Sequence, residues 1–174
     1  TAIGLQLDPL PAQTAAESAA ADSGVYLRFN DPPLLQLIAA ATGTTDVLVE
    51  GAVHPVVFGG WVGMLITFLN LLPVGQLDGG HMVRSMLGSR QRTIARAVPG
   101  ALLALAAYLF FIRDVTSSVG IWALWAVMSA GLAYVGPANP IDDAPLDRRR
   151  LLIGVATFAV GVLCFTPIPF EIVN

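Results

Sequence analysis

The chain has 174 residues, of which 55% are hydrophobic and 12% charged, and its mean hydropathy is +0.71. Because a typical soluble domain carries about 25% charged residues, this composition fits a globular cytosolic protein poorly. The net charge of −3 argues against a nucleic-acid partner, and the single cysteine, Cys164, excludes an intrachain disulfide and a CxxC metal site.

Residues 1–54 are predicted to form an extracytoplasmic loop region with a short interfacial helix. The first residues lack the basic stretch and the long apolar core of a signal peptide, and residues 1–7 resemble the tail of an upstream hydrophobic segment. We therefore expect the chain to be part of a longer protein. The pattern VYLRF at 25–29 predicts a short strand, and PLLQLIAAAT at 33–42 predicts an amphipathic helix too short to cross a membrane.

Four uncharged apolar runs then predict transmembrane helices, since a crossing takes about 20 residues. The second run is short, but the flanking Arg96 and Arg113 can extend to the two interfaces. The predicted fold class is all-α, a polytopic transmembrane helix bundle within residues 55–174. The alternative is that one or two runs are buried helices of a soluble protein. The expected spans are about 55–77, 97–113, 118–136 and 151–168.

The arginines predict the orientation of these spans. Seven arginines lie in the loops after the first and third spans, whereas Arg28 and Arg113 lie on the other side. Cytoplasmic loops carry an excess of Arg and Lys, so the two arginine-rich loops should lie in the cytoplasm and both chain ends outside. The predicted location is the cell membrane, which the chain crosses several times. Residues 77–97 and 137–150 should face the cytoplasm, and residues 8–50 and 113–118 should face outside.

The polar stretch NLLPVGQLDGGH occupies residues 70–81, at the inner end of the first predicted span. Unpaired polar groups are costly in hydrocarbon, so such residues usually have a function. Pro73 removes a backbone donor and should break the helix. The carbonyl groups freed at the break must face protein or water, which predicts a water-accessible cleft near the cytoplasmic face.

Several side chains of this stretch have two interpretations. Asp78 either caps a helix that begins at Gly79, with Gly79 and Gly80 allowing close packing, or is a metal ligand or acid/base. His81 could share a helical face with it, although a lone histidine is more often structural. Asn70 either donates an interhelical hydrogen bond or donates to a substrate backbone or oxyanion.

The stretch resembles the second signature of the site-2 protease family of intramembrane zinc metalloproteases, in which Asn-x-x-Pro precedes Leu-Asp-Gly in a broken transmembrane helix. HPVVFGGWVGMLITFL, PLDRRRLLIG and LCFTPIPF are similar to archaeal members in particular. The resemblance implies that Asp78 is a zinc ligand and that Asn70 has a catalytic role near the substrate or the oxyanion. It also implies a membrane-protein or membrane-helix substrate and contact with the lipid bilayer.

The sequence departs from the family pattern because it contains no HExxH motif. Its two histidines, His54 and His81, are 27 residues apart and cannot replace an i, i+4 pair. A catalytic zinc needs three protein ligands and an open position, so the resemblance implies that an HExxH half is missing upstream. We expect the C-terminal half of an intramembrane zinc metalloprotease, inactive by itself, that acts on membrane-embedded substrates near the cytoplasmic face.

Two other functions are compatible with the sequence. The chain could belong to a non-catalytic relative that binds membrane helices, which an intact gene without HExxH would indicate. It could also belong to a transporter or channel, because transporter sites lie at broken helices too. The transporter is disfavoured because we find no internal repeat and few ionisable residues within the predicted spans.

Overall fold

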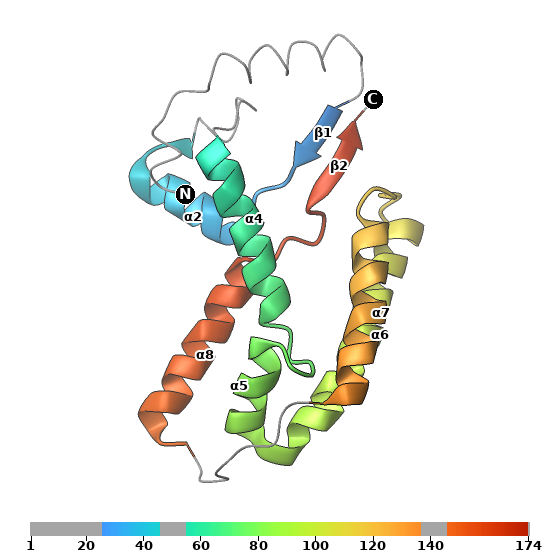
Figure 1. Ribbon diagram of the computed structural model, residues 1–174. Coiled ribbons are helices and arrows are strands. Elements are labelled where there is room, and N and C mark those ends of the chain that lie inside the picture. The colour runs from blue at the N-terminus through green and yellow to red at the C-terminus, as the bar shows by residue number, and fades with distance from the viewer. Residues whose placement is uncertain (1–25, 46–54, 137–145, 174) are drawn as a thin grey trace. The chain divides into compact units, whose positions relative to one another are not determined.

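The computed structural model describes residues 26–45, 55–136 and 146–173, and these are mostly helical (Figure 1). The chain divides into two compact units, which we call the first unit (Thr1–Ile66 with Leu163–Asn174) and the second unit (Thr67–Val162). The elements in chain order are β1 (Tyr26–Phe29), α2 (Pro33–Thr42), α4 (Pro55–Asn70), α5 (Asp78–Leu87), η2 (Gly88–Arg90), α6 (Gln91–Phe111), α7 (Val119–Val135), α8 (Arg148–Leu163) and β2 (Phe170–Val173).

The first unit contains a two-stranded antiparallel sheet, in which Phe29 of β1 lies opposite Phe170 of β2. The predicted strand at 25–29 is confirmed. The predicted all-α fold does not include the second strand, β2, that pairs with it. The predicted helix at 151–168 is too long, because α8 ends at Leu163. Proline cannot continue a helix and also disfavours helical geometry in the residue before it, so Pro167 and Pro169 extend the chain into β2.

An aromatic cluster joins the sheet to the start of α4. The ring of Phe29 lies edge-on to Phe58 and Trp61, with ring centroids 5.3 and 5.2 Å away. The Trp61 indole donates a hydrogen bond of 2.9 Å to the carbonyl of Asn30. The Asn30 side chain in turn donates one of 2.9 Å to the carbonyl of Ile168. Asn30 therefore links β1, α4 and the segment that follows α8.

Helix α2 has the bounds that the sequence predicts. Pro33 occupies the first turn, where its missing N–H costs nothing, and Gly43 ends the helix with a left-handed φ of 68°. Leu35 and Ala39, four residues apart, form its buried face. This is the pattern expected of a short amphipathic helix.

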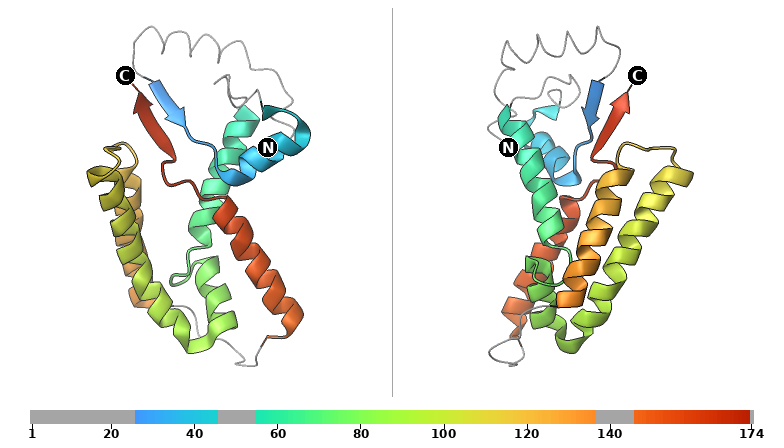
Figure 2. Two further views of the ribbon diagram at one scale, coloured as in Figure 1. Left: turned by 180° about the vertical axis from the view of Figure 1, so that it is seen from behind. Right: turned by 45° about the vertical axis from the view of Figure 1, so that its right-hand side comes forward.

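The second unit contains α6 and α7, which pack side by side as a helical hairpin (Figure 2). Leu102, Ala106 and Leu109 of α6 are buried, as are Trp122 and Ala126 of α7. The hairpin therefore has its own apolar core, within a unit that keeps many other apolar side chains exposed.

Within the described residues, one continuous helical stretch, Asp78–Phe111, is long and apolar enough to cross a membrane. Helices α4 and α7 are apolar but have only 16 and 17 residues. Helix α6 begins at Gln91, six residues before the expected span, and residues 78–90 before it are also helical. The proposed crossing by four spans stays a prediction.

Gln91, at the start of α6, is fully buried, and neither its side-chain nitrogen nor its oxygen has a hydrogen-bond partner among the described residues. A buried unsatisfied amide costs about 1–3 kcal/mol. Gln91→Met, which keeps the shape and removes the polar atoms, should therefore raise the free energy of unfolding by a similar amount, measured by denaturant unfolding in detergent. The exposed Gln76 is the matched control, and Gln76→Met should change stability by less than about 0.5 kcal/mol. Equal effects of the two substitutions would contradict the assignment.

Candidate functional site

The polar stretch forms a break between two helices. Helix α4 ends at Asn70 and α5 begins at Asp78, so the break predicted around Pro73 is confirmed. The N–H of Val74 donates to the carbonyl of Leu72 at 2.7 Å across Pro73, which makes a tight turn. Gly75 follows with a φ of 52°, a left-handed conformation that glycine adopts without strain. The residues between the helices therefore form a folded connection, which we call the 71–77 loop.

The two glycines that follow Asp78 let the 71–77 loop fold back against the first turn of α5. A Cβ atom added at Gly79 would overlap the carbonyl group of Leu71, and one added at Gly80 would overlap that of Gly75. On its other side, Gly75 lies so close to the backbone of Leu132 in α7 that a Cβ has no space there either. Backbone contacts on two sides thus fix the loop.

Asp78 is the first residue of α5, and its side chain is exposed. The N-cap position is held by Leu77, so the interpretation of Asp78 as the cap of a helix that begins at Gly79 is wrong. Among the described residues, its carboxylate has no hydrogen-bond or ion-pair partner. Its position in the first turn places the negative charge at the positive end of the helix dipole, which stabilises that charge.

Asn70 lies at the opposite end of the 71–77 loop, as the last residue of α4, and is also exposed. The interhelical hydrogen bond considered for it is not found within the described part of the chain. The amide of Asn70 and the carboxylate of Asp78 therefore lie at the two ends of the 71–77 loop. The structure does not test the roles of Asn70 and Asp78, which stay predictions.

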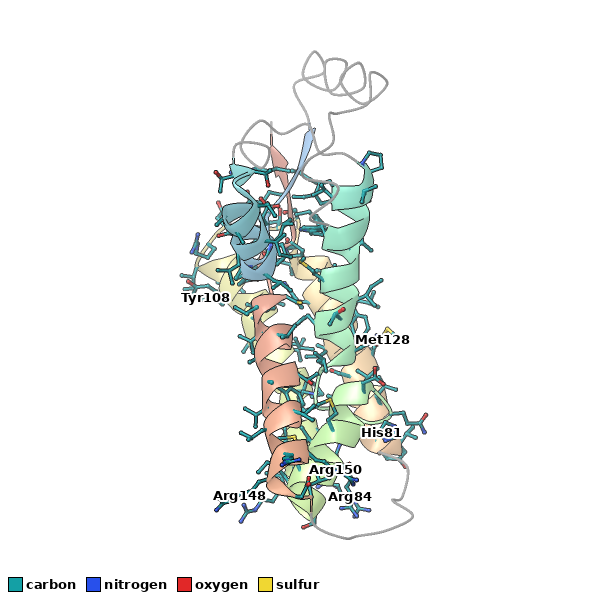
Figure 3. The ribbon with its side chains drawn as sticks, turned by 90° about the vertical axis from the view of Figure 1, so that its left-hand side faces the viewer. His81, Arg84, Tyr108, Met128, Arg148 and Arg150 are labelled. Atoms are coloured by element: carbon teal, nitrogen blue, oxygen red, sulfur yellow. The ribbon has the colours of Figure 1, made fainter. Side chains whose placement is uncertain are left out.

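His81 is exposed and lies one turn after Asp78, above Arg84 on α5 (Figure 3). No group of three or more His, Cys, Asp or Glu side chains lies close enough to hold a metal ion in residues 26–45, 55–136 and 146–173. His54 lies outside the described residues. The exposed Asp78 carboxylate could serve as one zinc ligand. The other two protein ligands of a three-ligand site would have to come from another segment.

A cavity of about 360 Å³ lies beside the break, within the second unit. Its walls are apolar and include Leu71, Pro73, Met86 and Phe158. Neither Asn70 nor Asp78 lines it, so this cavity is not the water-accessible cleft predicted at the polar stretch.

Residues 28–112 match Peptidase family M50. This segment, which contains the broken helix with Asn70 and Asp78, belongs to that family, and the resemblance to the site-2 proteases is confirmed. Members of this family are associated with membranes. No solved structure matches the chain.

Among named relatives, the chain is 31% identical to "Probable zinc metalloprotease EGY2, chloroplastic" of Oryza sativa subsp. indica, over 72% of this chain and 22% of that protein. It is 29% identical to "Probable zinc metallopeptidase EGY3, chloroplastic" of Arabidopsis thaliana, over 83% of this chain and 26% of that protein. A 62-residue stretch is 44% identical to "Probable zinc metalloprotease EGY1, chloroplastic" of Arabidopsis thaliana, over 34% of this chain and 11% of that protein. The chain thus spans about a quarter or less of the length of these relatives.

Proposed function

We propose that the chain is the C-terminal part of an intramembrane zinc metalloprotease that hydrolyses peptide bonds of membrane-embedded substrates near the cytoplasmic face. The observation that carries the proposal is the exposed Asp78 carboxylate on a helix that breaks within the segment matching Peptidase family M50. The relatives named as zinc metalloproteases support the metal. We place the protein in the cell membrane, although the names of the plant relatives place those proteins in the chloroplast.

In this proposal Asp78 holds the zinc together with ligands from an HExxH segment elsewhere in the intact protein. Zinc, when bound, supplies a Lewis acid that polarises a carbonyl and makes water more acidic. The chain itself contributes an anionic oxygen ligand, whose charge is stabilised by the start of α5 and whose position is fixed by the 71–77 loop. Such rigid support matters because a small misplacement of a reacting group costs much of the rate.

Asn70 is proposed to donate a hydrogen bond to the substrate backbone or to the oxyanion that develops during hydrolysis. Asn70→Ala in the intact protein should slow peptide cleavage by roughly 10²–10³, as loss of one oxyanion donor does, without loss of zinc. The measurement is a cleavage assay together with elemental analysis of the purified protein. Because Asn70 is exposed at a helix end, stability should hardly change. Undiminished cleavage would exclude Asn70 from the site, whereas loss of zinc would mean that it supports the metal.

The proposed topology places the 71–77 loop near the cytoplasmic face. Single cysteines at Ser89 and Ser23, each in a Cys164→Ser background, should be labelled by a membrane-impermeant thiol reagent from opposite sides of the membrane. Ser89 lies among arginines in η2, and Ser23 lies outside the described residues, within the predicted external region. Labelling of both from one side would overturn the topology and the cytoplasmic position of Asp78.

A further inference from the structure

Gln76 is the only exposed residue of the 71–77 loop, whose other residues are apolar and are buried or half-buried. Its side-chain amide has no hydrogen-bond partner among the described residues. A loop that is merely solvated is usually rich in small polar residues. A single free amide in an otherwise apolar loop therefore points to a molecule that binds there.

The backbone holds Gln76 at the corner of a tight turn between α4 and α5 (Figure 1). The N–H of Leu77 donates to the carbonyl of Val74 at 3.1 Å, which closes the turn. Gly75 and Gln76 occupy its two central positions. Gly75 lies against the backbone of Leu132, and the first turn of α5 packs against the loop from another side. The amide of Gln76 is therefore carried on a fixed support.

This support lies next to the proposed zinc ligand. Gln76 precedes Asp78 by two residues, so their Cα atoms are at most about 7 Å apart. An extended peptide advances about 3.3 Å for each residue. If the scissile bond of a substrate lies at Asp78, the substrate backbone about two residues away lies beside Gln76.

A substrate that is cleaved within a membrane has to leave its helical conformation around the scissile bond. The N–H and C=O groups that lose their helical partners are costly in hydrocarbon, because no water replaces those partners. An extended residue presents its N–H and C=O on the same edge of the chain. A glutamine amide matches this edge, because its nitrogen is a donor and its oxygen is an acceptor.

We propose that Gln76 is a substrate-binding residue that pairs with the backbone of the unwound substrate beside the scissile bond. Its Nε2 donates to a substrate carbonyl, and its Oε1 accepts the N–H of the same substrate residue. The pairing selects an extended backbone and is indifferent to the substrate side chain at that position. This inference rests on the proposed peptidase function, since it takes the substrate to be a membrane-embedded peptide.

The first test compares Gln76→Met with Gln36→Met in the intact, zinc-loaded protein. Methionine keeps the length of the side chain and removes both hydrogen-bonding atoms. The matched control, Gln36, is also exposed, on α2 of the first unit, where its Nε2 donates to the carbonyl of Asp31. The probe is a fluorescent peptide with one leucine-rich transmembrane helix of about 20 residues. Its binding in detergent is read from fluorescence anisotropy, and its cleavage from the products.

Gln76→Met should weaken peptide binding and lower kcat/KM at least about fivefold, because hydrogen bonds to the substrate are lost. Zinc content and thermal unfolding should not change, since Gln76 is exposed and has no partner in the described part of the chain. Gln36→Met should bind and cleave the peptide like the unchanged protein. If the peptide binds the unchanged protein no better than it binds Gln76→Met, the proposal is overturned.

The second test asks whether the substrate backbone is what Gln76 binds. Peptides methylated at one backbone nitrogen at a time lose one N–H each. At one position, methylation should weaken binding to the unchanged protein at least about fivefold and binding to Gln76→Met less than about twofold. Conformational effects of methylation act on both proteins and cancel in this comparison. The same loss in both proteins at every position would overturn the pairing with the backbone.

The binding measurement separates this inference from the proposed function, because it does not require cleavage. If the unchanged protein binds the peptide through Gln76 but never cleaves it, the peptidase proposal fails and the binding role of Gln76 stands. If cleavage requires Asp78 but Gln76→Met binds normally, the peptidase proposal stands and this inference fails.

Discussion

Asp78→Asn in the intact protein should abolish peptide cleavage and remove most of the bound zinc, while membrane insertion stays normal. The change keeps the shape of the side chain but removes the anionic oxygen that zinc needs from one of its three protein ligands. Stability should fall by only about 0.3–1 kcal/mol, the effect of one charge at a helix terminus, because the carboxylate is exposed and has no partner among the described residues. Cleavage, zinc content and thermal unfolding are measured on the same preparation.

Asp114→Asn is the matched control, because it makes the same chemical change elsewhere in the second unit. Asp114 is exposed in the turn between α6 and α7, with a φ of 54° that asparagine tolerates. This variant should keep full activity and full zinc. Full activity of Asp78→Asn would rule out the metal-ligand role, however closely LDGGH resembles the family. Equal loss of activity in both variants would indicate a general effect of charge.

The helix break could be predicted from the sequence because its cause is local. Pro73 lacks the N–H that a helix needs, and a glycine follows two residues later, so the end of α4 near Asn70 follows from backbone chemistry alone. The predicted start of α5 is Gly79, one residue after the observed start at Asp78. The difference matters because it moves Asp78 from the cap position into the first turn. Helix ends are the least certain feature of any sequence-based prediction.

Features that depend on distant segments could not be predicted. Strand β2 forms because β1 is available to pair with it, and nothing in FEIV itself requires this. The contact of Gly75 with Leu132 joins the break to a helix far along the sequence, and nothing in the local sequence around Gly75 indicates it. The sequence places the start of the second span at residue 97, whereas α6 begins at Gln91. The difference arises because charge-free runs locate the apolar part of a helix and miss its arginine-rich start.

Gly80→Ala should strongly impair both stability and cleavage, although it adds a single methyl group. The new Cβ would overlap the carbonyl oxygen of Gly75 and come within 2.7 Å of that of Val74. The 71–77 loop cannot withdraw, because Gly75 already lies against the backbone of Leu132. Overpacking of this kind costs about 1–3 kcal/mol. Any shift of the first turn of α5 displaces Asp78, so we expect cleavage to fall by about 10² or more.

Gly120→Ala in α7 separates this crowding from the general effect of removing a glycine. Gly120 is also helical, but a Cβ there meets nothing within 4 Å, so the substitution should stabilise its helix by up to about 1 kcal/mol and leave cleavage unchanged. Cleavage assays and thermal unfolding of the two variants decide the matter. If Gly80→Ala behaves like Gly120→Ala, the 71–77 loop does not rest on α5 as described. If Gly80→Ala loses activity but not stability, the loop yields to the methyl group, and its role is to position Asp78 rather than to hold the second unit together.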